Sequence, residues 1–271
     1  MQYFASTELH IDIKTAPLFH VGDFAITNAA LTGAVSTLFF IVAVVYVTRK
    51  IRRGEYNKFV GLVQWVFEAL YAQIRDIVPD RQIARSITPL AVTMFFVVLL
   101  GYWMSVLPGL DSIKWNGHPV LRSVAADLNF TFALALVSLV ATQAFAIKQL
   151  GGIGNLARYF RNPLKNPIGA FEGLLELIGE FSRYTALSLR LFGNCFAGEV
   201  LLLVMSVLTS YGAMVALPIF MIFEVFIGLI QAYIFFILTV IFTYLAVQGH
   251  GESRSDHTAL AEPLASGDDT I

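Results

Sequence analysis

Long segments without charged residues recur along the chain and are separated by short polar or basic stretches. Residues 24–48, 86–107 and 128–147 contain no Asp, Glu, Lys or Arg. At about 1.5 Å per residue, a helix of each length can cross a hydrocarbon core of about 30 Å. We predict that these three segments are transmembrane helices that run close to the membrane normal.

Residues 57–78 have a different pattern, in which apolar side chains recur every three or four residues. On a helix they form one stripe, with Gln64, Glu68 and Arg75 on the opposite side. The stripe contains Phe59, Val63, Val66, Leu70, Ile74 and Ile77. We predict a helix that lies in the membrane interface rather than a span. A helix of a soluble domain is the alternative, but the chain offers no such domain.

The last part of the chain contains two long helical patterns, at residues 169–208 and 213–248. Thr209-Ser210-Tyr211-Gly212 separates them. As helices they would be roughly 55–60 Å and 50–55 Å long, which is more than the thickness of the hydrocarbon core. We predict that they form a strongly tilted helical hairpin embedded in the membrane.

The composition supports an all-α polytopic membrane protein with a single membrane domain over residues 1–271. Hydrophobic residues make up 57% of the chain, charged residues only 14%, and the mean hydropathy is +0.71. A soluble domain has roughly 25% charged residues. The net charge of −1 gives no reason to expect a nucleic-acid partner.

The sequence does not predict a cofactor or a metal site. The single cysteine, Cys195, excludes an internal disulfide and a cysteine-based metal site, and we expect it to be a small buried residue. The chain contains no G-x-x-x-x-G-K-[ST] loop, so we do not expect it to bind a nucleotide in that way.

Basic residues follow the first and third predicted spans and indicate the topology. They are Arg49, Lys50, Arg52 and Arg53 after the first span, and Lys148, Arg158, Arg161 and Lys165 after the third. The positive-inside rule places these segments in the cytoplasm. We therefore predict an outer N-terminal segment at residues 1–23 and a flexible inner tail at residues 249–271. We expect a bacterial inner membrane, with an organellar inner membrane as the alternative.

Arg190 lies within the first of the two long helical patterns. A guanidinium keeps its proton in a protein, and placing it in mid-membrane costs at least about 2.5–3.5 kcal/mol. Asn194 shares its helical face, whereas Glu199 lies half a turn away and about 13.5 Å along the axis. An intrahelical salt bridge to Glu199 is therefore excluded. Arg190 faces either an ion path or, in a purely structural role, a partner on another helix.

Helical phase also relates the polar residues of the two long helices. Glu224 and Gln231 are seven residues apart and nearly in phase. An antiparallel hairpin that turns near residue 211 places Arg190 and Gln231 at one depth, and Glu199 and Glu224 at another, nearer the outer side. Interhelical hydrogen bonding is the structural alternative for Glu224 and Gln231.

Three glutamates recur every four residues near the start of the first long helix: Glu172, Glu176 and Glu180. Arg183 can reach Glu180 at a spacing of three residues. A solvated interfacial face explains these glutamates as well as an aqueous inlet does.

These residues lie in motifs that resemble subunit a of the rotary F-type ATP synthase. The most specific motif is Leu187-Ser188-Leu189-Arg190-Leu191-Phe192-Gly193-Asn194, followed by Ala197-Gly198-Glu199. Supporting motifs are Thr88-Pro89-Leu90, Ala126-Asp127-Leu128-Asn129 and Gln231-Ala232-Tyr233-Ile234-Phe235. The resemblance covers nearly the whole chain.

The resemblance implies a role for each polar residue of the long helices. Arg190 would face the ring of c subunits, with Asn194 and Gln231 as its polar neighbours. Glu199 and Glu224 would line an outer half-channel for protons.

At the inner half-channel, the resemblance implies roles for Glu176 and Arg183. Some relatives carry acidic residues in the first two spans, where this chain has Asn28 and Ser105. We therefore do not expect carboxylates of these two spans to line the outer channel.

The function implied is that of a stationary proton-channel subunit with two offset half-channels. Its expected partners are the c-ring, the b subunits of the peripheral stalk, membrane lipid and protons. ATP chemistry would take place on other subunits, so we do not expect an enzyme. A secondary ion-coupled transporter is the alternative, but it would show repeated halves, and no repeat is visible.

Overall fold

The structure is a computed structural model and describes residues 17–21, 24–107, 114–115, 118–119, 122–151, 159, 167–209 and 212–248. Its helices are α1 (Asn28–Arg52), α2 (Lys58–Ile77), α3 (Arg81–Val106), α4 (Leu128–Leu150), α6 (Pro167–Thr209) and α7 (Ala213–Gln248). Of these, 5 are long and apolar enough to cross a membrane, α2 being the exception. The predicted all-α polytopic membrane fold is confirmed.

The first span begins later than the sequence predicted. Strands β1 (Pro17–Val21) and β2 (Phe24–Thr27) form an antiparallel pair, so residues 24–27 are not part of the helix. Helix α1 begins at Asn28 because the Thr27 hydroxyl accepts a hydrogen bond from the Ala30 amide at 3.2 Å. Most of the predicted outer segment 1–23, and the whole predicted tail 249–271, lie outside the described residues.

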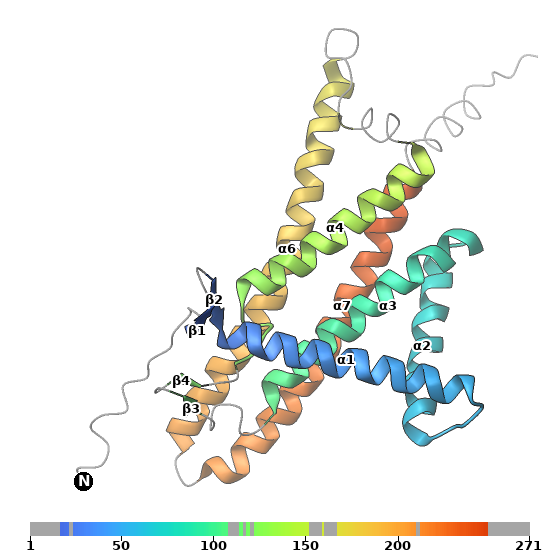
Figure 1. Ribbon diagram of the computed structural model, residues 1–271. Helices are drawn as coiled ribbons and strands as arrows, with labels where there is room; N and C mark the ends of the chain where they lie inside the picture. Colours follow the sequence, from blue (N-terminus) through green and yellow to red (C-terminus); the bar gives the residue numbers. More distant parts are fainter. Residues whose placement is uncertain are drawn as a thin grey trace, which may run out of the picture.

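A second small hairpin lies between α3 and α4 in the chain. It pairs β3 (Lys114–Trp115) with β4 (His118–Pro119). Neither hairpin changes the fold class, because both lie between or before the long helices (Figure 1).

The helices also extend into charged residues at the ends of the charge-free segments. Helix α3 begins at Arg81 rather than at residue 86, and the Asp80 carboxylate caps it by accepting from the Gln82 amide at 2.7 Å. Helix α1 continues to Arg52, beyond residue 48. A charge-free segment therefore identifies the apolar part of a helix but not its charged ends.

Helix α2 covers the range in which the sequence predicted an amphipathic helix. Its residues Val60, Leu70 and Ile74 are buried, whereas Trp65 is 70% exposed. In Figure 1 it stands beside the ends of α1 and α3, and it contacts both of these helices. Its location in the membrane interface stays a prediction.

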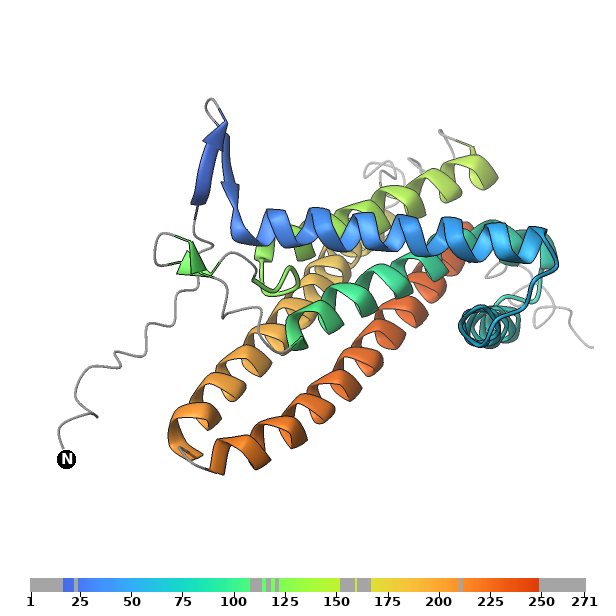
Figure 2. The ribbon, with the colours of Figure 1, turned by 60° about the horizontal axis from the view of Figure 1, so that its bottom comes forward.

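The hairpin of α6 and α7 is the largest feature of the fold. The two helices have 43 and 36 residues, which corresponds to about 65 Å and 54 Å. They lie antiparallel and are joined by a short turn, and both are oblique to α1 (Figure 2). Their tilt relative to a membrane stays a prediction.

Helices α3 and α4 pack on this hairpin and complete the core. Helix α3 lies along α7, and Phe95 of α3 packs edge-on against Phe236 of α7 with ring centroids 6.2 Å apart. Helix α4 contacts both α6 and α7, and in Figure 1 it runs obliquely from α6 toward the end of α7.

Buried hydroxyl pairs connect α4 to the hairpin. Ser138 and Thr239 lie 3.3 Å apart, and Thr142 and Thr243 lie 3.0 Å apart, so both pairs join α4 to α7. Ser188 of α6 donates to the Thr131 hydroxyl of α4 at 3.1 Å. Such interhelical hydrogen bonds stabilise membrane helices by about 0.6 kcal/mol on average.

Replacing Thr142 with valine is expected to lower the thermal stability of the protein slightly. The change keeps the side-chain shape and removes one interhelical hydrogen bond, so we expect a loss of about 0.6 kcal/mol. Thermal inactivation in detergent measures it. Thr185→Val is the matched control, because the Thr185 hydroxyl bonds to the Phe181 carbonyl of its own helix. Equal losses in both variants would contradict an interhelical role for Thr142.

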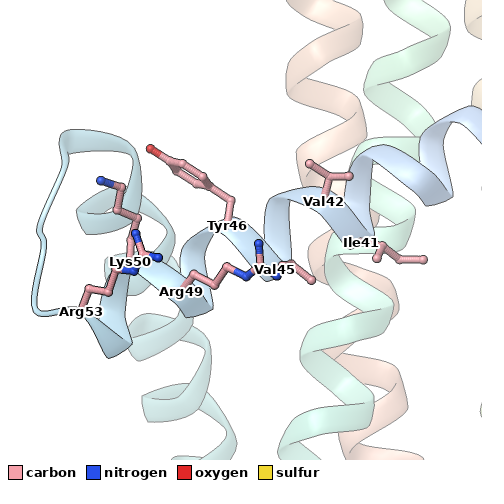
Figure 3. Close-up of a pocket in the computed structure, with 7 residues that line it drawn as sticks. All are labelled: Ile41, Val42, Val45, Tyr46, Arg49, Lys50 and Arg53. Atoms are coloured by element: carbon pink, nitrogen blue, oxygen red, sulfur yellow. The ribbon is translucent and has the colours of Figure 1, made fainter.

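Helix α1 exposes most of its apolar side chains, including Leu38 and Val42. Near its end, a shallow pocket of about 440 Å³ runs along one side of the helix (Figure 3). The pocket is lined by Ile41, Val42, Val45, Tyr46, Arg49, Lys50 and Arg53. An apolar surface that ends in basic residues suits a helix that faces lipid and ends at a membrane surface.

Candidate functional site

Arg190 lies on an exposed face of α6 and points away from the core of the chain. It forms no ion pair or hydrogen bond with any residue that the structure describes. The alternative that Arg190 pairs with another helix of this chain is therefore not supported among these residues. Small or polar side chains surround it on the same exposed face: Ala186, Gly193, Asn194 and Ala197.

Asn194 and Gln231 connect the two long helices one turn from Arg190. The Asn194 side-chain amide donates to Gln231 Oε1 at 2.8 Å. Gln231 is 1% exposed, and its Nε2 has no hydrogen-bond partner within the described part of the chain. The structure thus gives Gln231 the interhelical hydrogen bond that the sequence left as an alternative, and leaves one buried donor beside the face of Arg190.

Glu224 lies buried in the hairpin, at the depth that the sequence predicted for Glu199 and Glu224. Its carboxyl group is so close to Gly198 that a Cβ atom at that position would lie 2.4 Å from Glu224 Oε2. Because Gly198 precedes Glu199, the two glutamates lie at similar depths, as the position of the hairpin turn predicted. Glu199 itself is half-buried.

Tyr102 of α3 completes this level, although the sequence pattern did not predict it. It is 1% exposed, and its hydroxyl donates to Glu224 Oε2 at 3.0 Å. Its ring fills the space beside Gly228, where a Cβ atom would lie 2.5 Å from the ring. A tyrosine in an otherwise apolar span was the available signal, since a buried hydroxyl needs a partner.

Cys195 is buried, as expected, but its thiol also contacts polar groups. It lies 3.0 Å from the Ser123 hydroxyl and 3.7 Å from the Ser105 hydroxyl. Ser105 therefore belongs to the polar region around Tyr102, although it is not acidic. Asn28 lies elsewhere, at the start of α1, where its side chain accepts a hydrogen bond from the Ala29 amide at 2.9 Å.

A separate polar cluster lies toward the first half of α6. Glu180 is 7% exposed and accepts hydrogen bonds from Gln143 Nε2 at 2.8 Å and Tyr159 Oη at 2.5 Å. The Arg183 guanidinium lies over the Phe242 ring, 5.4 Å from its centroid. Arg183 thus packs toward α7, and Glu180 bonds toward α4 and Tyr159.

Glu176 is half-buried and lies one turn before Glu180 on α6. The resemblance pointed to Glu176 for the inner site, and the structure adds Glu180 as a buried carboxylate that accepts from Gln143 and Tyr159. No group of three or more His, Cys, Asp or Glu residues that could hold a metal ion occurs within the described ranges.

The comparisons with known proteins identify the family. Residues 30–244 match the family model described as ATP synthase A chain. The chain belongs to the ATP synthase A chain family. Two similar relatives, named ATP synthase subunit a, come from Mycobacterium bovis and Mycobacterium tuberculosis. Each is 34% identical over 229 residues, which cover 82% of this chain and 87% of the relative. A relative of the same name from Acidothermus cellulolyticus is 29% identical over 238 residues, 86% of this chain and 81% of its own.

The match to the ATP synthase A chain family includes the whole polar region of the hairpin. Residues 30–244 include Arg190 and Gln231, and also Glu199, Glu224 and Glu180. The resemblance to subunit a of the F-type ATP synthase is therefore confirmed. With its long apolar helices and its bacterial relatives, this member of the family is a multi-pass bacterial membrane protein.

Proposed function

We propose that this chain is the stationary proton-channel subunit of an F-type ATP synthase. The observation that carries the proposal is the position of Arg190, which is exposed on a membrane-embedded helix and has no ion pair among the described residues. A guanidinium left alone in a bilayer is unfavourable by at least about 2.5–3.5 kcal/mol. It needs an anionic partner on another chain.

The partner we propose is a carboxylate on a rotating ring of c subunits. The small residues Ala186, Gly193 and Ala197 around Arg190 favour this, because small side chains let another helix approach closely in a membrane. A guanidinium next to a carboxylate stabilises its ionised form. Arg190 would therefore keep the ring carboxylate charged while the carboxylate passes it.

The two polar clusters of the hairpin support two separate proton paths. Glu224 and Glu199 would line the outer half-channel, near the level of Tyr102. Glu180, with Glu176 and Arg183 near it, would line the inner half-channel. The proposal places the N-terminus outside and the C-terminus in the cytoplasm, in agreement with the basic residues that follow α1 and α4.

Proton flow through these paths would turn the ring. A proton enters from the outer side near Glu224 and neutralises a ring carboxylate, which then rotates into lipid. After nearly a full turn, the carboxylate releases its proton near Glu180. Arg190 stops protons from passing directly between the paths. Each proton that crosses 100 mV supplies about 2.3 kcal/mol.

The other expected partners follow from the same proposal. The exposed apolar residues of α1 would face lipid and the b subunits of the peripheral stalk. ATP would be made on other subunits, so this chain would be non-catalytic.

Photo-crosslinking from position 197 tests the proposed partner. A photoreactive phenylalanine analogue in place of Ala197 is expected to crosslink to the ring subunit, because Ala197 shares the exposed face of Arg190. The same analogue at Leu38, which is 63% exposed on α1, is the control and should not reach the ring. Crosslinks to the ring from Leu38 but not from position 197 would show that the proposed interface is on the wrong face.

A further inference from the structure

The Tyr102 hydroxyl lies between two acceptors on different helices. One is Glu224 Oε2 of α7, at 3.0 Å. The other is the backbone carbonyl of Asn194 on α6, at 3.3 Å. Since Tyr102 comes from α3, this single oxygen joins three helices at the level of the proposed outer half-channel.

A phenol has one proton to donate, so it cannot fully satisfy both acceptors at once. Two arrangements fit the same atomic positions. When Glu224 is a carboxylate, the Tyr102 hydroxyl donates to it. When Glu224 carries a proton, the carboxylic acid donates to Tyr102 Oη, and the phenol proton turns to the Asn194 carbonyl. No heavy atom needs to move between the two arrangements.

We propose that Tyr102 is a positioning residue that holds the Glu224 side chain in both its protonated and its ionised form. Glu224 would gain or lose one proton at each exchange, and Tyr102 would keep its own and only reorient it. The inference rests on the proposed function, because it assigns to Glu224 the exchange of protons with the outer side.

The packing around Tyr102 supports this role. Its ring is fixed beside Gly228, and the Glu224 carboxyl lies beside Gly198, so the Tyr102 hydroxyl cannot easily turn away from the carboxyl group. The titratable groups close enough to influence the Tyr102 hydroxyl electrostatically are Glu224 of α7 and Glu199 and Cys195 of α6.

The contact with Asn194 also links Tyr102 to the polar residues beside Arg190. The side chain of Asn194 donates to Gln231, one turn from Arg190. Tyr102 therefore connects the level of Glu224 to the polar residues beside the proposed ring contact. This connection fixes where Glu224 lies relative to those residues and passes no proton itself, because a backbone carbonyl only accepts a hydrogen bond.

Tyr102→Phe tests the inference in the assembled complex, in inverted membrane vesicles. ATP-driven proton pumping is measured per assembled complex while the pH on the outer side is varied. Loss of a hydrogen bond to a charged group is expected to reduce the rate about tenfold. Because the bond to the ionised carboxylate is stronger than the bond to the neutral acid, its loss is also expected to raise the pH of half-maximal rate by about one unit. Tyr102→Gln supplies a donor and an acceptor again, and should recover part of both effects.

Tyr46→Phe is the matched control, because it removes a hydroxyl from a side chain that is 41% exposed on α1. It should leave the rate and the pH profile unchanged. A native rate and profile in Tyr102→Phe would overturn the inference. So would a lower rate with an unchanged profile, or failure to assemble, since either result would make the hydroxyl merely structural.

Arg190→Ala, measured in the same series, separates this inference from the proposed function. If Arg190→Ala assembles and pumps normally, the proposed function fails and the inference fails with it. If Arg190→Ala is inactive and Tyr102→Phe behaves like the native protein, only the role of Tyr102 is wrong.

Discussion

Arg190→Ala is expected to abolish ATP-driven proton pumping while the complex still assembles. The side chain is exposed and has no ion pair among the described residues, so its removal leaves no partner group of this chain uncompensated. Assembly should therefore survive. The ring carboxylate, however, loses the positive charge that keeps it ionised and separates the two half-channels. We expect the loss of pumping to exceed about 100-fold, which corresponds to about 2.7 kcal/mol.

Pumping in inverted vesicles, with the assembled complex quantified in the same samples, measures this effect. Arg85→Ala is the matched control, because Arg85 is an exposed arginine of α3 that lies outside both polar clusters. Arg190→Lys separates charge from shape, since lysine keeps the positive charge but not the planar fork of donors. Normal assembly with intact pumping in Arg190→Ala would remove Arg190 from the ion path.

Much of the hairpin could be predicted from the sequence, because helical phase and length are properties of one segment. The periodicity placed Arg190 and Asn194 on one face, and the position of the turn set the depths of Glu199 and Glu224. The structure agrees on these points, since Glu224 lies against Gly198 and Gln231 bonds to Asn194. The high cost of a charged arginine in lipid depends on the residue and its apolar segment alone, so the sequence is sufficient to make Arg190 the centre of the candidate site.

The residues that other helices bring to the hairpin could not be predicted in this way. Tyr102 reaches Glu224 only because of how α3 lies on α7, and Gln143 reaches Glu180 only because of how α4 lies on α6. The helical phase of one segment does not predict which of its faces packs on which neighbouring helix. The predicted start of the first span was wrong for a related reason. Residues 24–27 are apolar enough for a span, but their pairing with another strand makes them β2.

The two glycines beside Tyr102 and Glu224 provide the second test with a large expected effect. Gly228→Ala would place a Cβ atom 2.5 Å from Cδ1 and 2.9 Å from Cγ of Tyr102. The ring is buried, so it cannot turn away without disturbing the packing of α3 on α7. We expect a loss of stability of about 1–3 kcal/mol from this overpacking, with less assembled complex.

Gly198→Ala should behave differently, although its Cβ atom would lie equally close, 2.4 Å from Glu224 Oε2. The clashing atoms are the end of a flexible side chain, so the carboxyl group can swing aside while the helices stay in place. We therefore expect near-native assembly but slower pumping, because the displaced carboxyl loses its hydrogen bond from Tyr102.

Thermal inactivation, the amount of assembled complex and the pumping rate, measured together, distinguish the two variants. Gly61→Ala is the control, because no atom lies within 4 Å of its Cβ position on α2. It should be neutral or slightly stabilising, as alanine favours a helix by about 1 kcal/mol over glycine. If Gly198→Ala lost assembly as severely as Gly228→Ala, the Glu224 carboxyl would be a fixed part of the packing. The different outcomes expected for the two glycine sites would then be wrong.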